Sequence, residues 1–317
     1  RTTALGGKLN ALSDDDLSLA ANNPSLLIPE MDNHLFFNYV DYIADINYGY
    51  ASYSRNQKGI GSFAAGIQYI NYGRFIGADE TGLKTGNFYA AEYALNLIYS
   101  RPLGKDSCFY AGVNIKPLYS SLDNYSSLGI ATDWGITYHR SPYFMASVVF
   151  KNLGTQIKPY YNHYYEPLPF EIQAGISQKL EHAPFRFSFV FQHLEKPDMT
   201  YTVTDSSSSE NAGSGQKGVL NKLGDKCMRH LIIGVEFTPF NNFFLRAGYN
   251  YQRRKEMQVE QRIGMVGFSW GIGLKISKFH IDYGHSAYHL GAVVNQFSIG
   301  MNLGEFYHKT SFIREEK

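Results

Sequence analysis

The sequence predicts an all-β protein, a transmembrane antiparallel β-barrel of about fourteen strands. The first observation is strict alternation: residues 185–192 read Phe-Arg-Phe-Ser-Phe-Val-Phe-Gln, so one face is apolar and the other is mostly polar. A period of two is that of a β-strand. The pattern recurs at 89–100, 170–177 and 243–251. About ten residues of such alternation per segment, separated by turn residues, is typical of outer-membrane barrels.

Composition is the second observation. The 317 residues include 25 Tyr and 22 Phe, more than the core of a soluble chain of this size requires, whereas charged residues make up only 18%. No apolar run approaches the ~18 residues of a transmembrane helix. Because only helices and closed barrels satisfy their backbone hydrogen bonds in lipid, a membrane protein with this sequence must be a barrel. The net charge of +1 argues against a nucleic-acid partner.

The third observation is the distribution of connection lengths. Connections after even-numbered segments are short, whereas most after odd-numbered segments are long, as at 73–86, 152–169, 194–228, 252–261 and 285–294. Outer-membrane barrels have short periplasmic turns and longer extracellular loops. We therefore place the barrel at 34–303, in the outer membrane, with the long connections outside. The strand-like segments start near Leu35, Ile46, Ile60, Asn87, Cys108, Ser127, Tyr143, Phe170, Phe185, Arg229, Asn242, Arg262, Lys278 and Asn295.

A soluble β-sandwich also alternates, but its polar face would be rich in Lys, Glu and Thr. Here the polar face is Gly, Ala, Ser, Asn and Gln with isolated charges of both signs, which favours a crowded lumen in which charges pair across the interior. These charges are Glu92, Lys116, Glu171, Arg186, Glu236, Arg246 and Asp282.

The two ends of the chain do not alternate. In residues 1–33, Asp14-Asp15-Asp16 before Leu17 reads as the start of a short helix, and Asn23-Pro24 ends it. We predict that 1–33 is an N-terminal helical plug in the lumen and that 304–317 is a periplasmic tail. Because the sequence starts at Arg1 without a signal peptide, we expect an export signal to have been removed.

The candidate binding residues lie in two of the long connections. Tyr160, Tyr161, Tyr164 and Tyr165 stand close together between prolines, and exposed aromatic residues on a loop indicate packing against something. They either cap the barrel mouth or contact a partner. The run Arg253-Arg254-Lys255-Glu256 is either a solvated loop tip or a contact for anionic lipopolysaccharide and outer-membrane lipid.

No catalytic, cofactor or metal site is predicted, so we expect no enzyme. His285 and His289 have metal-like spacing, but that spacing converges only on a helix and falls here in a predicted loop. Gly271-Ile272-Gly273 reads as a strand kink rather than a dinucleotide site. Cys108 opens a strand on the periplasmic side and Cys227 lies in an external loop, so the two are too far apart for a disulfide.

The N-terminal segments resemble those of a known family. Residues 1–7 (RTTALGG) and 15–27 (DDLSLAANNPSLL) are similar to the start of the PorQ family, outer-membrane components of the Bacteroidetes type IX secretion system. Asn23-Pro24-Ser25 also resembles the Asn-Pro-Ala of FadL-like fatty-acid transporters, which have fourteen strands and an N-terminal lumenal segment. The related PorV barrels share this architecture.

The resemblance implies a protein-transport role rather than chemistry. It predicts a non-enzymatic barrel that anchors a PorZ-like surface protein in an attachment complex with PorU- and PorV-type components, where secreted cargo is processed. Under this prediction Tyr160, Tyr161, Tyr164, Tyr165, Arg253 and Arg254 would contact the partner. The alternatives are a FadL-like channel for hydrophobic small molecules and a PorV-like cargo shuttle. A channel needs a continuous apolar pocket with an exit, whereas an anchor needs a closed plug and adhesive external loops.

Overall fold

The chain folds into one closed barrel around its own N-terminal segment. The computed structural model describes residues 1–12, 14–44, 46–104, 108–200, 216–257, 264–289 and 291–307, and the side chains of 216–222 and Tyr307 are not described. The fourteen strands are β1(His34–Asp41), β2(Asn47–Gln57), β3(Gly61–Ala78), β4(Lys84–Leu103), β5(Phe109–Leu122), β6(Tyr125–Ser141), β7(Phe144–Lys158), β8(Glu171–Lys179), β9(Phe185–Phe191), β10(Leu231–Phe240), β11(Phe243–Asn250), β12(Phe268–Ile276), β13(Phe279–His289) and β14(Ala292–Asn302). The helices are η1(Thr3–Leu5), η2(Leu17–Ala21), η3(Pro24–Leu26) and η4(Pro29–Met31), which are 3₁₀, and α1(Gln216–Arg229), α2(Tyr251–Met257) and α3(Gly304–Tyr307).

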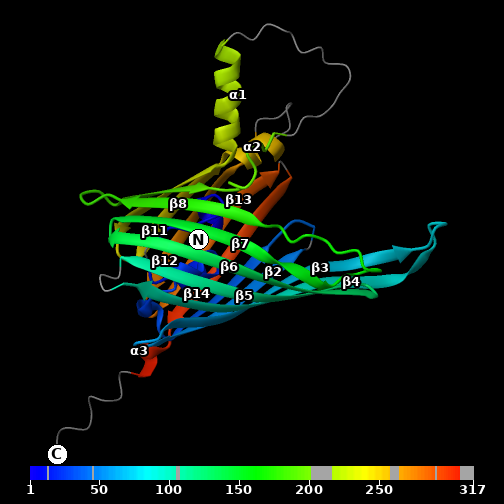
Figure 1. The fold of residues 1–317 in the computed structure, drawn as a ribbon, viewed down its shortest axis with the longest axis horizontal. Helices are drawn as coiled ribbons and strands as arrows, with labels where there is room; N and C mark the ends of the chain where they lie inside the picture. The colour runs from blue at the N-terminus through cyan, green and yellow to red at the C-terminus, as the bar shows by residue number, and fades with distance from the viewer. Residues whose placement is uncertain are drawn as a thin grey trace, which may run out of the picture.

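Every strand pairs antiparallel with its sequence neighbours, and β1 closes the barrel against β14 (Figure 1). The closing register runs from His34 opposite Asn302 to Asp41 opposite Asn295. The predicted fold of fourteen antiparallel strands is therefore confirmed. Most predicted strand starts lie close to the observed ones, but β12 begins at Phe268 instead of Arg262.

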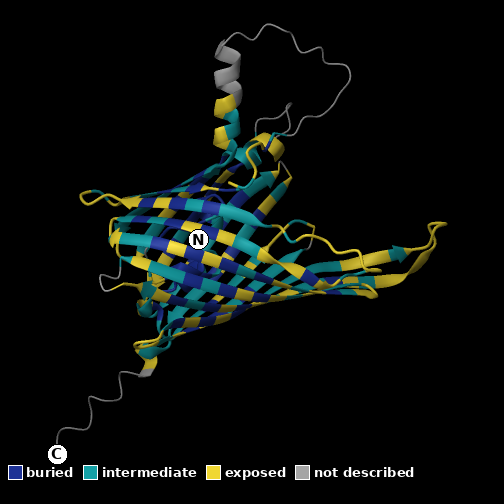
Figure 2. Ribbon diagram, viewed as in Figure 1, coloured by how far each residue is buried: buried dark blue, intermediate teal, exposed yellow. Residues whose placement is uncertain are grey.

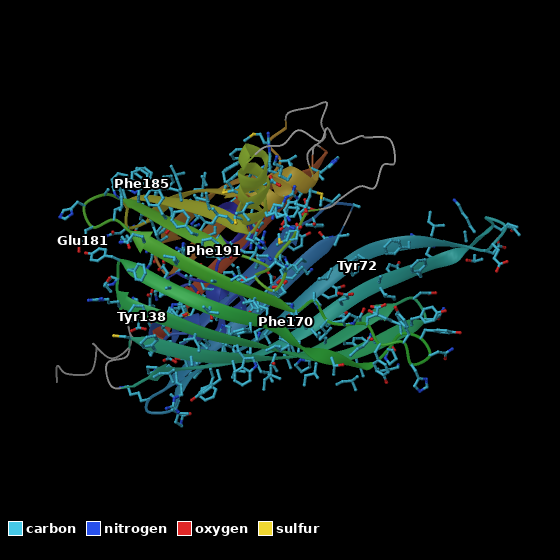
Figure 3. The ribbon with its side chains drawn as sticks, turned by 45° about the horizontal axis from the view of Figure 1, so that its top comes forward. Tyr72, Tyr138, Phe170, Glu181, Phe185 and Phe191 are labelled. Carbon is cyan, nitrogen blue, oxygen red and sulfur yellow. The ribbon has the colours of Figure 1, made fainter. Side chains whose placement is uncertain are left out.

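Alternation along the strands sorts side chains between lipid and lumen. In β9, Phe185 and Phe191 are exposed whereas Ser188 and Val190 are buried, and Figure 3 shows the two phenylalanines on the wall. The same stripes of buried and exposed residues run around the barrel in Figure 2. In a closed barrel each strand pairs with a neighbour on both sides, so the backbone hydrogen bonds are made within the sheet, as a bilayer requires. The apolar side chains on the outer surface can face lipid. The protein is an outer-membrane β-barrel.

None of the described helices is both long and apolar enough to span a bilayer.

The two walls of the barrel differ in strand length, and this changes the predicted loops. β3 and β4 run through most of the predicted loop 73–86 and project beyond the neighbouring strands as a ribbon (Figure 1). Asp79 closes its tip by accepting hydrogen bonds from the backbone N–H groups of Thr81 and Leu83. The alternation pattern did not predict the ribbon, because a register shift between Asn71 and Arg74 interrupts the alternation there.

The other predicted loops are also shorter than expected. β7 takes up 152–158 of the loop 152–169, and β13 and β14 leave only 290–291 of 285–294. The loops 194–228 and 252–261 hold α1 and α2, although 201–215 and 258–261 lie outside the described residues, as does most of the tail 304–317. The hydroxyl of Tyr251 in α2 donates to Asp225 Oδ1 in α1 at 2.6 Å. Partial burial and this bond raise the pKa of Tyr251 to about 12, so it stays a donor at neutral pH.

The segment 1–33 lies inside the barrel, and the short helix predicted after Asp16 is the 3₁₀ helix η2, one of four 3₁₀ helices in this segment. Asp16 caps η2 as predicted, its side chain accepting from Ser18 N at 2.9 Å. Leu5, Leu19 and Leu27 are at most 1% exposed. η1 packs on β10 to β13 and η3 on β4 to β6, so the segment bridges opposite parts of the sheet. We call residues 1–33 the plug.

Candidate functional site

A buried network of charges fixes the plug in the lumen. The Arg1 guanidinium bonds to Asp14 Oδ2 at 2.8 Å, to Glu236 at 3.0 Å and to Asp16 Oδ2 at 3.3 Å. Two of these partners lie in the plug and one lies on the wall in β10. Because Arg1 is only 2% exposed, these bonds must replace its hydration, and they attach the plug to the wall.

The wall contributes two more guanidiniums to this network. Arg186 reaches Glu236 Oε1 at 3.1 Å, Arg246 Nε donates to Glu236 Oε2 at 2.6 Å, and Arg246 also pairs with Asp282. All four carboxylates that are buried among the described residues, Asp16, Asp133, Glu236 and Asp282, have a cationic partner. The predicted pairing of lumenal charges is thus confirmed for Glu236 and Asp282, but Glu236 meets Arg186 and Arg246 on the neighbouring strands and not across the interior.

A second attachment is built from uncharged groups around Asn23-Pro24-Ser25. Asn23 Nδ2 donates to the carbonyl of Asn10 at 2.7 Å and to Thr137 Oγ1 of β6 at 3.1 Å. Asn23 Oδ1 accepts from Ser25 N and Ser25 Oγ at 3.0 and 2.6 Å. All four hydrogen-bonding positions of this amide are thus used, so the motif forms both the cap of η3 and a bond to the wall.

Glycines on the wall make room for the plug. A Cβ on Gly112 would lie 2.3 Å from the Pro24 carbonyl carbon, and one on Gly175 would lie 1.8 Å from Asn10 Oδ1. Gly271, predicted to be a strand kink, instead faces η1, because its Cβ would lie 2.5 Å from that of Ala4. The high glycine content of the polar faces therefore reflects a filled lumen.

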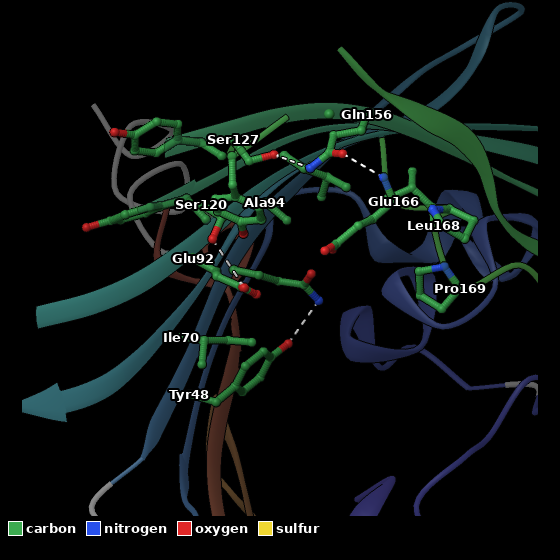
Figure 4. Close-up of a pocket in the computed structure, with 17 residues that line it drawn as sticks. Tyr48, Ile70, Glu92, Ala94, Ser120, Ser127, Gln156, Glu166, Leu168 and Pro169 are labelled. Atoms are coloured by element: carbon green, nitrogen blue, oxygen red, sulfur yellow. Dashed lines mark hydrogen bonds between the residues drawn. The ribbon is translucent and has the colours of Figure 1, made fainter. Parts of the chain in front are cut away.

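A cavity of about 280 Å³, which we call the chamber, lies at the end of the lumen toward the ribbon of β3 and β4 (Figure 4). We call this end the outer end, because its connections are the ones predicted to be extracellular. Its wall consists of residues from β2 to β7, and its other side is the segment 166–169, which leads into β8. The chamber combines apolar and aromatic surface with polar groups. Its lining includes Tyr48, Gln68, Ile70, Glu92, Ala94, Leu118, Ser120, Ser127, Gly129, Gln156, Tyr160, Glu166, Pro167, Leu168 and Pro169.

Hydrogen bonds fix the polar side chains of the chamber. Gln156 donates to Ser127 Oγ at 2.7 Å and accepts from the backbone N–H of Glu166 at 2.9 Å. The second bond holds the segment 166–169, which we call the inward segment, against β7. Gln68 donates to the Tyr48 hydroxyl at 2.9 Å. The lining is thus set before any ligand enters, as in most small-molecule sites.

The structure divides the four tyrosines predicted to contact a partner. Tyr160 lines the chamber, whereas Tyr161, Tyr164 and Tyr165 are 65%, 74% and 52% exposed. The cap and partner alternatives thus each retain support, the first from Tyr160 and the second from the other three. Partner contact at these residues stays a prediction.

The two predicted arginines have partners within the chain. The Arg253 guanidinium lies 3.8 Å from the centre of the Tyr288 ring and donates to Ser286 Oγ at 2.8 Å. Arg254 donates to the carbonyls of Gly264 and Val266. Both side chains hold α2 over the outer end of the barrel, and their predicted contact with a partner or lipopolysaccharide stays a prediction.

The other motifs have structural positions of their own. His285 and His289 lie in strand β13, where a loop was predicted, and His285 Nδ1 is 2.9 Å from Asn295 Oδ1. No group of metal-binding side chains occurs within the described parts of the chain. Cys108, at the inner end of the barrel, and Cys227, in α1, are not joined by a disulfide.

Sequence reasoning missed the chamber because its residues come from six strands and a loop. Glu92 is predicted to be lumenal, but Tyr48, Gln68 and Gln156 do not stand out in the sequence. The available signal was the tandem Glu166-Pro167-Leu168-Pro169, since two prolines fix an extended segment that cannot join a central strand.

Solved structures with a similar fold are outer-membrane barrels. The toluene transporter TbuX of Ralstonia pickettii has a TM-score of 0.55 and 12% identity, covering 95% of this chain and 96% of that chain. The toluene transporter TodX of Pseudomonas putida has a TM-score of 0.52 and 12% identity, covering 94% and 95%. A FadL homologue of Pseudomonas aeruginosa has a TM-score of 0.54 and 11% identity, covering 95% and 97%.

No protein-family profile and no curated protein sequence matches the chain. At these identities the solved structures show a shared fold. The class that fold and lumen define is a plugged, FadL-like outer-membrane barrel with fourteen strands.

Proposed function

We propose that the protein is a non-enzymatic, FadL-like outer-membrane channel that admits small hydrophobic molecules from the outside. The observation that carries the proposal is the chamber, a cavity of about 280 Å³ at the outer end of the lumen with apolar walls and a few fixed polar groups. Such a combination is typical of small-molecule sites. Two proteins that share the fold are toluene transporters.

The plug defines what transport would require. It lies between the chamber and the inner end of the barrel and is bonded to the wall through Arg1 and Asn23. A molecule in the chamber therefore reaches the periplasm only if the plug shifts or if it leaves the lumen before the plug. The chamber is the entry site in either case.

The test fills the chamber. A Cβ on Gly129 would meet nothing closer than 3.5 Å, so this position accepts a side chain, and Gly129→Phe would occupy the chamber. A Cβ on Gly49 would meet no atom within 4 Å, and Gly49 alternates with the lumenal Tyr48 and Tyr50, so Gly49→Phe adds the same ring to the outer face as a control. We expect cells with Gly129→Phe to take up labelled toluene about tenfold more slowly than cells with Gly49→Phe. Equal uptake by the two variants would contradict the proposal.

A second candidate is a surface anchor of the type IX secretion system, which holds a PorZ-like protein beside PorU- and PorV-type components. The observation that favours it is the group of exposed tyrosines Tyr161, Tyr164 and Tyr165 on one external loop. Tyrosine is enriched in the centres of interfaces because it buries a large area with one polar group. The similarity of 1–7 and 15–27 to the PorQ family also supports this candidate, whereas the PorV-like shuttle is supported by the resemblance alone.

The anchor has a test that leaves the chamber intact. We expect the triple change of Tyr161, Tyr164 and Tyr165 to Ser to release the PorZ-like protein into the medium, because truncating a central aromatic residue costs ~2 kcal/mol or more of binding free energy. The control is Tyr160→Ser, which changes the chamber and not the exposed group. If the partner stays on the cells with the triple variant, the anchor role is excluded.

A further inference from the structure

The carboxylates of the chamber are arranged differently from those around the plug. Glu92 and Glu166 both line the cavity, from β4 and from the inward segment, and Figure 4 shows both side chains directed toward its centre. Glu92 accepts hydrogen bonds from uncharged groups, Ser120 Oγ at 3.3 Å and the Tyr72 hydroxyl. No Lys or Arg is among the described residues that line the chamber.

Elsewhere in the lumen, carboxylates are paired with cationic side chains. Glu236 meets three guanidiniums, Asp133 pairs with Lys116 at 2.6 Å, and even the half-buried Glu171 pairs with Lys8. A carboxylate in a confined site with low-dielectric walls creates a negative potential that attracts a counter-ion. The chamber has one such charge, the half-buried Glu92, and the exposed Glu166 adds a second carboxylate that is more open to solvent.

The remaining surface of the chamber selects the kind of cation. Tyr48 and Tyr160 line the chamber together with the apolar side chains of Ile70, Leu118 and Leu168. Aromatic faces attract ammonium groups through their quadrupole, and quaternary ammonium ligands are recognised in this way. Gln68 and Gln156 are engaged with Tyr48 and with Ser127, whereas a carboxylate has about four acceptor positions, so Glu92 can still accept from a ligand beyond the bonds it already has.

We propose that the chamber binds small organic cations, an ammonium group carried on an aromatic or short aliphatic body, and disfavours anionic amphiphiles. The cationic group lies between Glu92 and Glu166, and the apolar body lies against Tyr48, Leu118 and Leu168. This inference rests on the proposed function, because it names the ligand class for the same chamber. Among the small hydrophobic molecules of the proposed function, it favours those that carry a positive charge.

The experiment compares three probes that share a phenyl ring and differ in charge: benzyltrimethylammonium, benzyl alcohol and benzoate. Their affinities for the purified barrel in uncharged detergent are measured by isothermal titration calorimetry. We expect the cation to bind at least tenfold more tightly than benzoate, which is about 1.4 kcal/mol. Raising the salt concentration from about 0.05 M to about 0.5 M should weaken the cation and leave benzyl alcohol unchanged, since ions screen only the charged probe.

Neutral isosteres identify the groups responsible. We expect Glu92→Gln with Glu166→Gln to weaken benzyltrimethylammonium about tenfold and to change benzyl alcohol less than twofold. The control is Glu80→Gln, an exposed glutamate at the tip of the ribbon formed by β3 and β4, which should change neither affinity. Glu166→Gln alone provides a variant that folds, because its side chain is exposed, and it should show part of the loss.

Each outcome decides between the two proposals. If benzyl alcohol binds the chamber but the cation binds no more tightly, or if the double variant keeps the full preference for the cation, the inference is overturned and the channel proposal stands. If none of the three probes binds the wild-type barrel, the chamber is not a ligand site and both proposals fail.

Discussion

The two ends of the lumen differ in whether their carboxylates have cationic partners. At the plug end, Arg1, Arg186 and Arg246 surround Glu236, and wall glycines such as Gly112 and Gly175 allow the plug to approach the strands closely. At the outer end, a cavity remains and Glu92 and Glu166 lack cationic partners among the residues that line it. The barrel strands supply polar side chains at both levels. Satisfied charges mark the part of a lumen built for stability, and unsatisfied charges mark the part left for a ligand.

The largest effect should come from removing the central carboxylate of the plug. Glu236→Leu leaves three guanidiniums short of a partner, those of the buried Arg1 and Arg246 and of the half-buried Arg186. Breaking a buried ion pair from one side costs about 3–5 kcal/mol. We expect a lower free energy of unfolding in urea and a plug that becomes accessible to added protease. The matched change Glu92→Leu in the chamber should have a much smaller effect on the free energy of unfolding, because Glu92 has no cationic partner among the residues that line the chamber. Equal losses for the two would erase the distinction between the ends of the lumen.

Glycines provide the next comparison. Gly112→Ala places a Cβ within 2.5 Å of three backbone atoms of Pro24 and Ser25, so the plug must move, at a cost of about 1–3 kcal/mol. Gly129→Ala, at the chamber, meets only ordinary contacts. We expect a lower urea midpoint and higher single-channel conductance for Gly112→Ala only. A normal midpoint for that variant would mean that the plug is loosely held.

The smallest effect should come from Glu166→Gln. Its side chain is exposed, and surface substitutions usually change the free energy of unfolding by less than about 0.5 kcal/mol. Unchanged melting together with a changed affinity for cations would sharpen the comparison, because it separates binding from stability. A large loss of stability would instead place Glu166 among the structural charges.

The sequence predicted the strands of the barrel and the facing of their side chains better than it predicted how the lumen is filled. Phe185 and Phe191 face outward and Ser188 and Val190 inward as the alternation indicates, because a period of two is a local property. Inside the barrel, however, Ser188 and the plug residue Leu5 both lie against Gly234, where a Cβ would come within 2.4 Å of Ser188 Oγ and 3.1 Å of Leu5 Cδ2. That filling depends on contacts between residues hundreds of positions apart, which no local pattern records.

The same limit explains the candidate site. Tyr160 stood out because four tyrosines lie close together, yet the structure separates it from Tyr161, Tyr164 and Tyr165 by turning the chain into the lumen. Glu92 was predicted to be lumenal, but whether it has a cationic neighbour depends on the register of β4 against β3 and β5. The sequence shows the charge of each residue, whereas only the structure shows whether an oppositely charged side chain lies beside it.

The plug also has a consequence for the order of assembly. η1 contacts β10 to β13 and η3 contacts β4 to β6, so the first residues of the chain touch strands from both halves of the sheet. Once β1 has paired with β14, a segment of this width has no wide opening through which to enter, and its charged groups would have to cross the lumen unpaired. We therefore expect the plug to lie inside the curved sheet before β1 pairs with β14. The strands would then close around the N-terminal segment, which contacts both halves of the sheet.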